Sequence, residues 1–279
     1  MIDYCTILFD KNEVQLLRLH LNSLKHYAGD LFNFKISVPE DPAADEIFMG
    51  ICEEFDAQVL IHPVYTQKLN NPGLRQSGFD CANRLDKLMQ ACTSEWVFLA
   101  QSDLVWTGNP MVKLEPLMMP AYGMLGIWPH GATVINRDVY SGCHHAFWPN
   151  GGWMGKVTPD GTHVQLIGCT EGGVRRIRCP GQTGKLVKVE GEKVGVLMPD
   201  ECPRRNGNYI DIDGVDVGML LRMEMQGYGF LFDYGGALPF YHHIGGASLH
   251  GVSGPDKDAI KLGISSKIAS ALEQYKEFA

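Results

Sequence analysis

Trp96-Val-Phe-Leu-Ala-Gln-Ser-Asp-Leu-Val-Trp106 is the stretch of sequence that decides the fold. An apolar run of this length is typical of a strand buried in the middle of a sheet. The run ends abruptly in Gln101, Ser102 and Asp103. A carboxylate at the carboxyl end of such a strand points into the crevice where open α/β sheets bind ligands. The alternative is a strand that simply ends in a polar loop, and the neighbouring elements decide between the two.

The residues before this run alternate between strand and helix patterns. Three β-rich segments each precede a segment with apolar residues at helical spacing. The strand segments are 5–10, 34–38 and 57–61, and the helical segments are 14–27, 47–55 and 85–92. This alternation predicts a parallel, Rossmann-like sheet with right-handed crossovers. The turn from Asp10 to Glu13 contains no Gly, and no Gly-x-x-x-x-Gly-Lys loop occurs, which argues against NAD enzymes and P-loop ATPases.

Composition excludes several other classes. The chain has 279 residues, 45% of them hydrophobic, and can bury a full core. Its net charge of -8 argues against a general nucleic-acid surface. Its eight Cys form no compact disulfide framework, and no apolar stretch reaches transmembrane length. With no signal peptide pattern, we expect a cytoplasmic protein without an integral membrane segment.

We expect three parts along the chain. Residues 1–110 form a nucleotide-binding α/β half, and residues 111–255 form an acceptor and metal half. Glycine-rich turn signals predict a loop-rich β insertion at about 140–205 within that second half. Apolar residues at helical spacing predict a closing helix within 256–279.

Five polar motifs follow one another in a recognisable order. A polar turn containing Asp10 and Asn12 follows the first strand, and Glu40 and Asp41 follow the second. Gln101-Ser102-Asp103 closes the central strand. An Asp-rich segment at 213–228 has apolar helix positions and ends in Gly-Tyr before a short strand. The last motif is Phe-Tyr-His-His-Ile-Gly-Gly at 240–246.

In this order of motifs the chain resembles the nucleotide-sugar glycosyltransferases of the GT-A fold, especially the family-2 group. The resemblance covers residues 1–110 and about 205–250. It implies a single GT-A-like α/β domain with a mostly parallel, Rossmann-like sheet plus the loop-rich β insertion. It also implies a divalent ion, Mn²⁺ or Mg²⁺, on the donor diphosphate, because Mg²⁺-type sites use one or two carboxylates together with substrate phosphates.

The resemblance assigns roles to particular residues. The metal candidates are Asp103, His242 and His243, of which at most one His is expected to coordinate. The candidates for binding the nucleotide are Asp10, Asn12, Glu40, Asp41 and Ser102.

The catalytic base is expected among neighbouring aspartates, because Gly214 stands where the resemblance places the carboxylate. Asp213 and Asp216 are the candidates. If Asp213 caps the following helix, its side chain turns back onto the backbone. Asp216 would then lie in the first helical turn, where the helix dipole keeps it ionised. We therefore favour Asp216.

The leading hypothesis is a non-processive glycosyltransferase. It would move a sugar from a nucleoside-diphosphate sugar, with a UDP-sugar favoured, to the hydroxyl of a glycan or small molecule. One alternative is a non-catalytic nucleotide- or carbohydrate-binding relative, favoured by Gln101 and Gly214. The other is a sugar nucleotidyltransferase, which the glycine-free turn after the first strand disfavours.

Overall fold

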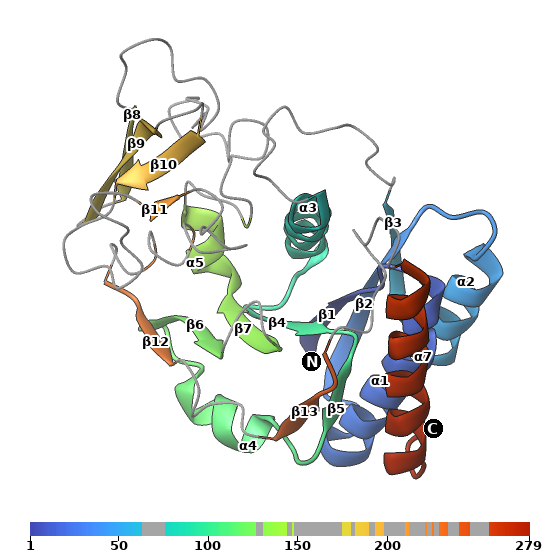
Figure 1. The fold of residues 1–279 in the computed structure, drawn as a ribbon. Helices are drawn as coiled ribbons and strands as arrows, with labels where there is room; N and C mark the ends of the chain where they lie inside the picture. The colour runs from blue at the N-terminus through green and yellow to red at the C-terminus, as the bar shows by residue number, and fades with distance from the viewer. Residues whose placement is uncertain are drawn as a thin grey trace.

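The computed structural model shows an α/β fold around one large sheet (Figure 1). The structure describes residues 1–62, 76–126, 131–143 and 147, followed by 175–179, 182–189, 193–197, 210–211, 221, 225, 229–233, 240–245 and 257–279.

Seven strands form the main sheet in the order β12–β6–β7–β4–β1–β2–β3. Their bounds are β1 Ile2–Ile7, β2 Phe32–Pro39, β3 Gln58–His62, β4 Trp96–Gln101, β6 Tyr122–Gly126, β7 Ala132–Asn136 and β12 Leu231–Asp233. Strand β7 runs antiparallel to β4 and β6, and every other neighbouring pair is parallel. The predicted mostly parallel, Rossmann-like sheet is therefore confirmed.

Strand β4 lies in the middle of this sheet, as predicted from its apolar run. Successive side chains of a strand point to opposite faces. Trp96 and Phe98 pack into the core on one face, and Val97 and Leu99 pack into the core on the other. The run is continuously apolar because both faces of this strand are covered.

Helices cover both faces of the sheet. On one face lie α1 (Val14–Ala28) and α2 (Asp45–Glu54), with α7 (Lys257–Gln274) packed against α1; on the other lie α3 (Gln76–Ala91) and α5 (Arg137–Gly142) (Figure 1). The remaining short helices are η1 (Lys11–Glu13), α4 (Met111–Leu114) and η2 (Glu115–Leu117). The predicted helices at 14–27, 47–55, 85–92 and 256–279 are confirmed within a few residues, except that α3 begins well before residue 85. None of the described helices is long and apolar enough to cross a bilayer.

Three of the four strands of a second sheet lie within the segment 140–205, where β structure was expected, and the fourth follows shortly after it. Strands β8 (Arg175–Cys179), β9 (Gln182–Val189) and β10 (Lys193–Leu197) pair antiparallel, and β11 (Ile210–Asp211) joins β10. The boundaries proposed for the parts of the chain stay predictions.

A short two-stranded ribbon belongs to neither sheet. Strand β5 (Leu104–Trp106) directly follows the polar turn after β4, and it pairs antiparallel with β13 (Tyr241–His243). Tyr241 lies opposite Trp106, and His243 lies opposite Leu104. This pairing brings a segment near residue 240 to the carboxyl end of the central strand.

Candidate functional site

The β5–β13 ribbon brings two of the predicted metal ligands together. His243 Nε2 lies 3.3 Å from Asp103 Oδ1. The Asp103 side chain is 11% exposed and that of His243 is 29% exposed, so the pair sits at a partly open edge. A backbone hydrogen bond also joins the two segments, because the amide of Ile244 donates to the carbonyl of Asp103 at 3.0 Å.

The electrostatics of the pair follow from this contact. The neighbouring Asp103 carboxylate raises the pKa of His243 above its ordinary value. His243 Nε2 is buried and makes no well-aligned hydrogen bond with any described residue, so the contact with Asp103 is an ion-pair approach. A ligand that coordinates both groups at this corner would replace this ion pair.

The donor set suits a divalent ion that is shared with a substrate. Neighbouring ligand atoms around an octahedral ion with bonds of about 2.1 Å lie about 3 Å apart, close to the distance between His243 Nε2 and Asp103 Oδ1. No group of three His, Cys, Asp or Glu side chains with metal-site geometry occurs among the described residues. Two protein ligands plus phosphate oxygens are enough for Mg²⁺-type binding, so the residues present fit such an ion only together with a substrate.

His242 lies on the opposite side of β13. Its Nδ1 is 2.6 Å from the hydroxyl of Tyr275, which follows the last turn of α7. Adjacent residues of a strand face opposite ways, so only His243 of the two histidines approaches Asp103. The structure thus separates the two candidates that the sequence left together.

Ser102 also lies at this edge, and it contacts a residue that the sequence analysis did not select. The Ser102 hydroxyl donates to Glu13 Oε2 at 3.0 Å, and the amide of Phe9 donates to the same oxygen at 3.1 Å. Glu13 is 2% exposed. Glu13 therefore joins the carboxyl ends of β1 and β4. In the sequence, its only signal was a glutamate at the end of the polar turn.

Arg84 of α3 is a second residue that the sequence analysis missed. Its guanidinium donates to the carbonyls of Leu8 at 2.7 Å and Ser37 at 2.9 Å, and also to the Ser37 hydroxyl. Arg84 is 4% exposed. These buried hydrogen bonds join the carboxyl ends of β1 and β2, which lie at the same edge of the sheet as Asp103.

The other predicted nucleotide-binding residues lie in the turns after β1 and β2. Asp10 Oδ1 accepts from the amide of Asn12 at 2.8 Å, so Asp10 caps η1. Glu40 is exposed, and Asp41 Oδ1 accepts from the amide of Ala43 at 3.1 Å. These residues surround the carboxyl edge, but none of them contacts Asp103 or His243 in a described interaction. Asp213 and Asp216 lie outside the described residues.

A buried polar network supports β5 from inside the core. His20 Nδ1 lies 3.0 Å from the carbonyl of Leu104, so Nδ1 carries the proton and donates. Nε2 then accepts from the hydroxyl of Tyr4 at 2.6 Å, and that oxygen accepts from Trp106 Nε1 at 3.2 Å. Burial lowers the pKa of His20 to about 4. His20 is therefore neutral at pH 7, and all three side chains are satisfied.

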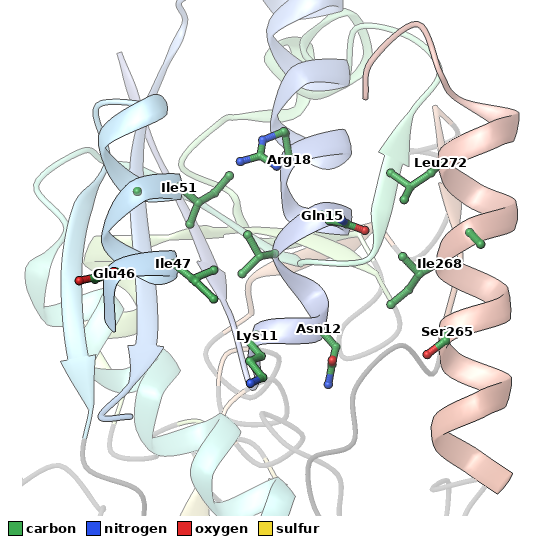
Figure 2. Close-up of a pocket in the computed structure, with 13 residues that line it drawn as sticks. Lys11, Asn12, Gln15, Arg18, Glu46, Ile47, Ile51, Ser265, Ile268 and Leu272 are labelled. Atoms are coloured by element: carbon green, nitrogen blue, oxygen red, sulfur yellow. The ribbon is translucent and has the colours of Figure 1, made fainter. Parts of the chain in front are cut away.

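A groove of about 760 Å³ lies on the helical face (Figure 2). Helix α1 forms its floor, with Ile47 and Ile51 of α2 on one side and Ile268 and Leu272 of α7 on the other. Asn12 lies at one end of this groove. Neither Asp103 nor His243 lines it. We place the candidate site at the ribbon because charged and polar groups converge there.

Comparison with known proteins gives structural matches only. No protein-family model and no curated protein matches the chain. A mannosyltransferase from Pyrobaculum calidifontis, solved with GDP-Man and Mn²⁺, has a TM-score of 0.40 and 12% identity over 54% of this chain and 48% of its own. Glucosyl-3-phosphoglycerate synthase from Mycobacterium tuberculosis, solved with Mn²⁺ and UDP, has a TM-score of 0.36 and 12% identity over 51% of this chain and 57% of its own.

Mouse xyloside xylosyltransferase 1 is a third similar structure, with a TM-score of 0.34 and 12% identity over 49% of this chain and 68% of its own. The chain thus aligns with about half the length of the first two structures. All three are glycosyltransferases, the class that the sequence motifs resemble. Similarity at this level carries no argument about activity, which has to come from the site itself.

Proposed function

We propose that the chain is a non-processive glycosyltransferase that uses a nucleoside-diphosphate sugar and a divalent metal ion. The observation that carries the proposal is the contact between Asp103 and His243 at the carboxyl edge of the central strand. These residues are 140 positions apart, and both belong to motifs that the resemblance assigned to the metal. Open α/β sheets bind their ligands at this edge.

The proposed reaction exchanges one bond to the sugar for another. The acceptor hydroxyl oxygen forms a bond to the anomeric carbon, and the bond from that carbon to the diphosphate oxygen breaks. The leaving diphosphate keeps the electron pair. When bound by Asp103 and His243, Mn²⁺ or Mg²⁺ would supply positive charge beside that leaving group.

The remaining roles are proposed from the motifs. Glu40 and Asp41 are proposed to hold the base and ribose, with a UDP-sugar as the favoured donor. Asp10, Asn12 and Ser102 complete the proposed nucleotide set. The proton of the acceptor hydroxyl would pass to a carboxylate within hydrogen-bond reach. Asp216 is the proposed base, with Asp213 as the alternative.

The proposed experiment is a screen of donor sugars. The protein is incubated with UDP- and GDP-sugars, with and without Mn²⁺, and release of the nucleoside diphosphate is measured. We expect metal-dependent release with at least one donor, and its loss in Asp103→Asn. Release that is equal in the wild type and Asp103→Asn would reject the proposed site.

A binding protein without catalytic activity is the second candidate. Gln101 stands where the resemblance places a first metal carboxylate, which favours this reading. Thermal shift with UDP and GDP distinguishes the two. Stabilisation that requires Mn²⁺ supports the enzyme, whereas stabilisation of equal size without Mn²⁺ supports the binding protein.

A further inference from the structure

The ribbon that carries Asp103 and His243 is short. Each strand contributes three residues, and an isolated two-stranded ribbon is at best marginally stable in water. The distance between His243 and Asp103 depends on the register of β13 against β5. A slip of one residue would turn His243 outward and bring its neighbour inward, because side chains alternate between faces. Which way His243 faces therefore depends on the contacts that each face of the ribbon makes.

Helix α7 covers the outer face of this ribbon. Val105 of β5 packs in one apolar cluster with Ile264, Ile268 and Phe278. His242 lies directly opposite Val105 in the β5–β13 pairing. Side chains of directly opposed residues share one face of a ribbon. The α7 side of the ribbon is therefore the Val105 and His242 side, and Leu104 and His243 share the other side.

One side-chain hydrogen bond joins this outer face to the end of α7. The Tyr275 hydroxyl lies 2.6 Å from His242 Nδ1, and the side-chain Nε2 of Gln274 donates to the same hydroxyl at 3.0 Å. The end of the chain is itself fastened, because Asn22 Nδ2 donates to the carbonyl of Phe278 at 2.9 Å. These hydrogen bonds hold the segment around Tyr275 in place beside His242. Figure 1 shows α7 beside α1, whose residues Leu16 and Leu19 belong to the same cluster as Val105.

We propose that Tyr275 is a positioning residue for the metal site: by binding His242 on the outer face of β13, it keeps His243 on the inner face against Asp103. The inference rests on the proposed metal role of Asp103 and His243. It gives the second histidine of the motif a task other than coordination. It also assigns the carboxyl-terminal helix to the site, although no residue of α7 reaches Asp103 or His243 in a described interaction.

The test compares Tyr275→Phe with Tyr27→Phe. Both changes remove one hydroxyl from a partly exposed tyrosine, and Tyr27 lies near the end of α1, where its ring packs against His26 and Phe278. Mn²⁺ binding in the presence of UDP is measured by calorimetry, and amide hydrogen exchange of residues 240–245 is measured without metal. We expect Tyr275→Phe to weaken Mn²⁺ binding roughly three- to ten-fold, the effect of one lost hydrogen bond, and to speed exchange in 240–245. Tyr27→Phe should change neither.

A double-variant cycle tests whether Tyr275 acts through His242. If it does, Tyr275→Phe combined with His242→Ala should weaken Mn²⁺ binding no more than His242→Ala alone. His242→Gln retains a side chain that can bond the Tyr275 hydroxyl, and it should recover most of the affinity. Additive losses, or unchanged exchange and affinity in Tyr275→Phe, would overturn the proposal.

The proposed function can fail separately from this inference. If the wild type binds no Mn²⁺ with UDP, the proposed function is wrong. Hydrogen exchange in the metal-free protein then tests the inference by itself. Faster exchange of residues 240–245 in Tyr275→Phe, but not in Tyr27→Phe, supports the positioning role of Tyr275. Equal exchange in both variants rejects that role.

Discussion

The two sides of helix α1 differ in their chemistry and in the space beside them. On the buried side, Glu13 just before the helix bonds Ser102, and His20 bonds the carbonyl of Leu104. On the other side, Gln15 and Arg18 line the groove of about 760 Å³ between α2 and α7 (Figure 2). Arg18 is already paired with Glu54 there, at 2.9 Å. The groove has the volume, whereas the ribbon edge has the converging groups. Catalysis requires converging charged and polar groups, so the ribbon edge is the better candidate for the active site.

The largest effect that tests this comparison is expected at Asp103. Asp103→Asn keeps the size of the side chain but removes the charge. We expect Mn²⁺ binding in the presence of UDP to weaken at least about 100-fold, beyond what loss of an outer-sphere partner causes. Calorimetry measures the affinity, and circular dichroism checks that the fold is retained. Tight Mn²⁺ binding by a folded Asp103→Asn variant would move the metal away from this edge.

The next effect separates the two adjacent histidines. His243→Gln should weaken Mn²⁺ binding at least about 10-fold because it replaces a proposed ligand, whose loss costs no less than that of an outer-sphere partner. His242→Gln, the matched control, should change the affinity less than about threefold because the amide can still bond Tyr275. The same calorimetric titration measures both variants. The reverse order of effects would mean that β13 presents its other face to the ion.

A smaller effect concerns the buried network below β5. The pKa of His20 is about 4 in the folded protein and about 6.5 in an unfolded chain. The neutral form is favoured by folding, so this contribution to stability is present above pH 6.5 and is lost as the pH falls toward 4. We expect a loss of about 2 kcal/mol in the free energy of unfolding between pH 7 and pH 5.

Urea unfolding at the two pH values measures this loss, with His20→Gln as the comparison. The variant lacks the titrating group, so its stability should fall by about 2 kcal/mol less over the same interval. An equal fall in both proteins would show that His20 does not titrate as its burial implies.

The smallest effect is expected in the groove. Gln15→Ala and Ile47→Ala alter its floor and one wall. Because neither residue contacts Asp103 or His243 in a described interaction, both variants should bind Mn²⁺ and UDP within about twofold of the wild type, as distant sites are normally independent. A loss of tenfold or more in calorimetry would show that the groove belongs to the site.

The parts of the fold that sequence predicted best are those with strong periodic signals. The run at 96–101 is apolar on both faces because β4 is covered on both faces. The helix that starts near Val14 ends at Gly29, whose backbone φ of 62° suits glycine. Strands β5 and β13 contain three residues each and carry no such period. Their pairing joins residues far apart in the chain, which local patterns do not encode.

The site residues, like the fold, were predictable where a local pattern marked them and not where a long-range pairing placed them. A carboxylate at the end of a central strand identified Asp103, because strand ends in α/β sheets face the ligand crevice. Two adjacent histidines could not be separated before the register of β13 was known, because register alone decides which one faces inward. Glu13 and Arg84 escaped notice because a first-turn glutamate and a helical arginine are ordinary surface residues in most sequences. Only burial reveals their role.

Pulsed electron paramagnetic resonance on the complex of the protein with Mn²⁺ and UDP tests the central claim most directly. If Asp103 and His243 together hold the ion, the spectrum should show coupling to one imidazole nitrogen in the wild type and in His242→Gln. That coupling should disappear in His243→Gln. A bound ion without nitrogen coupling in the wild type, or coupling that persists in His243→Gln, would contradict the account.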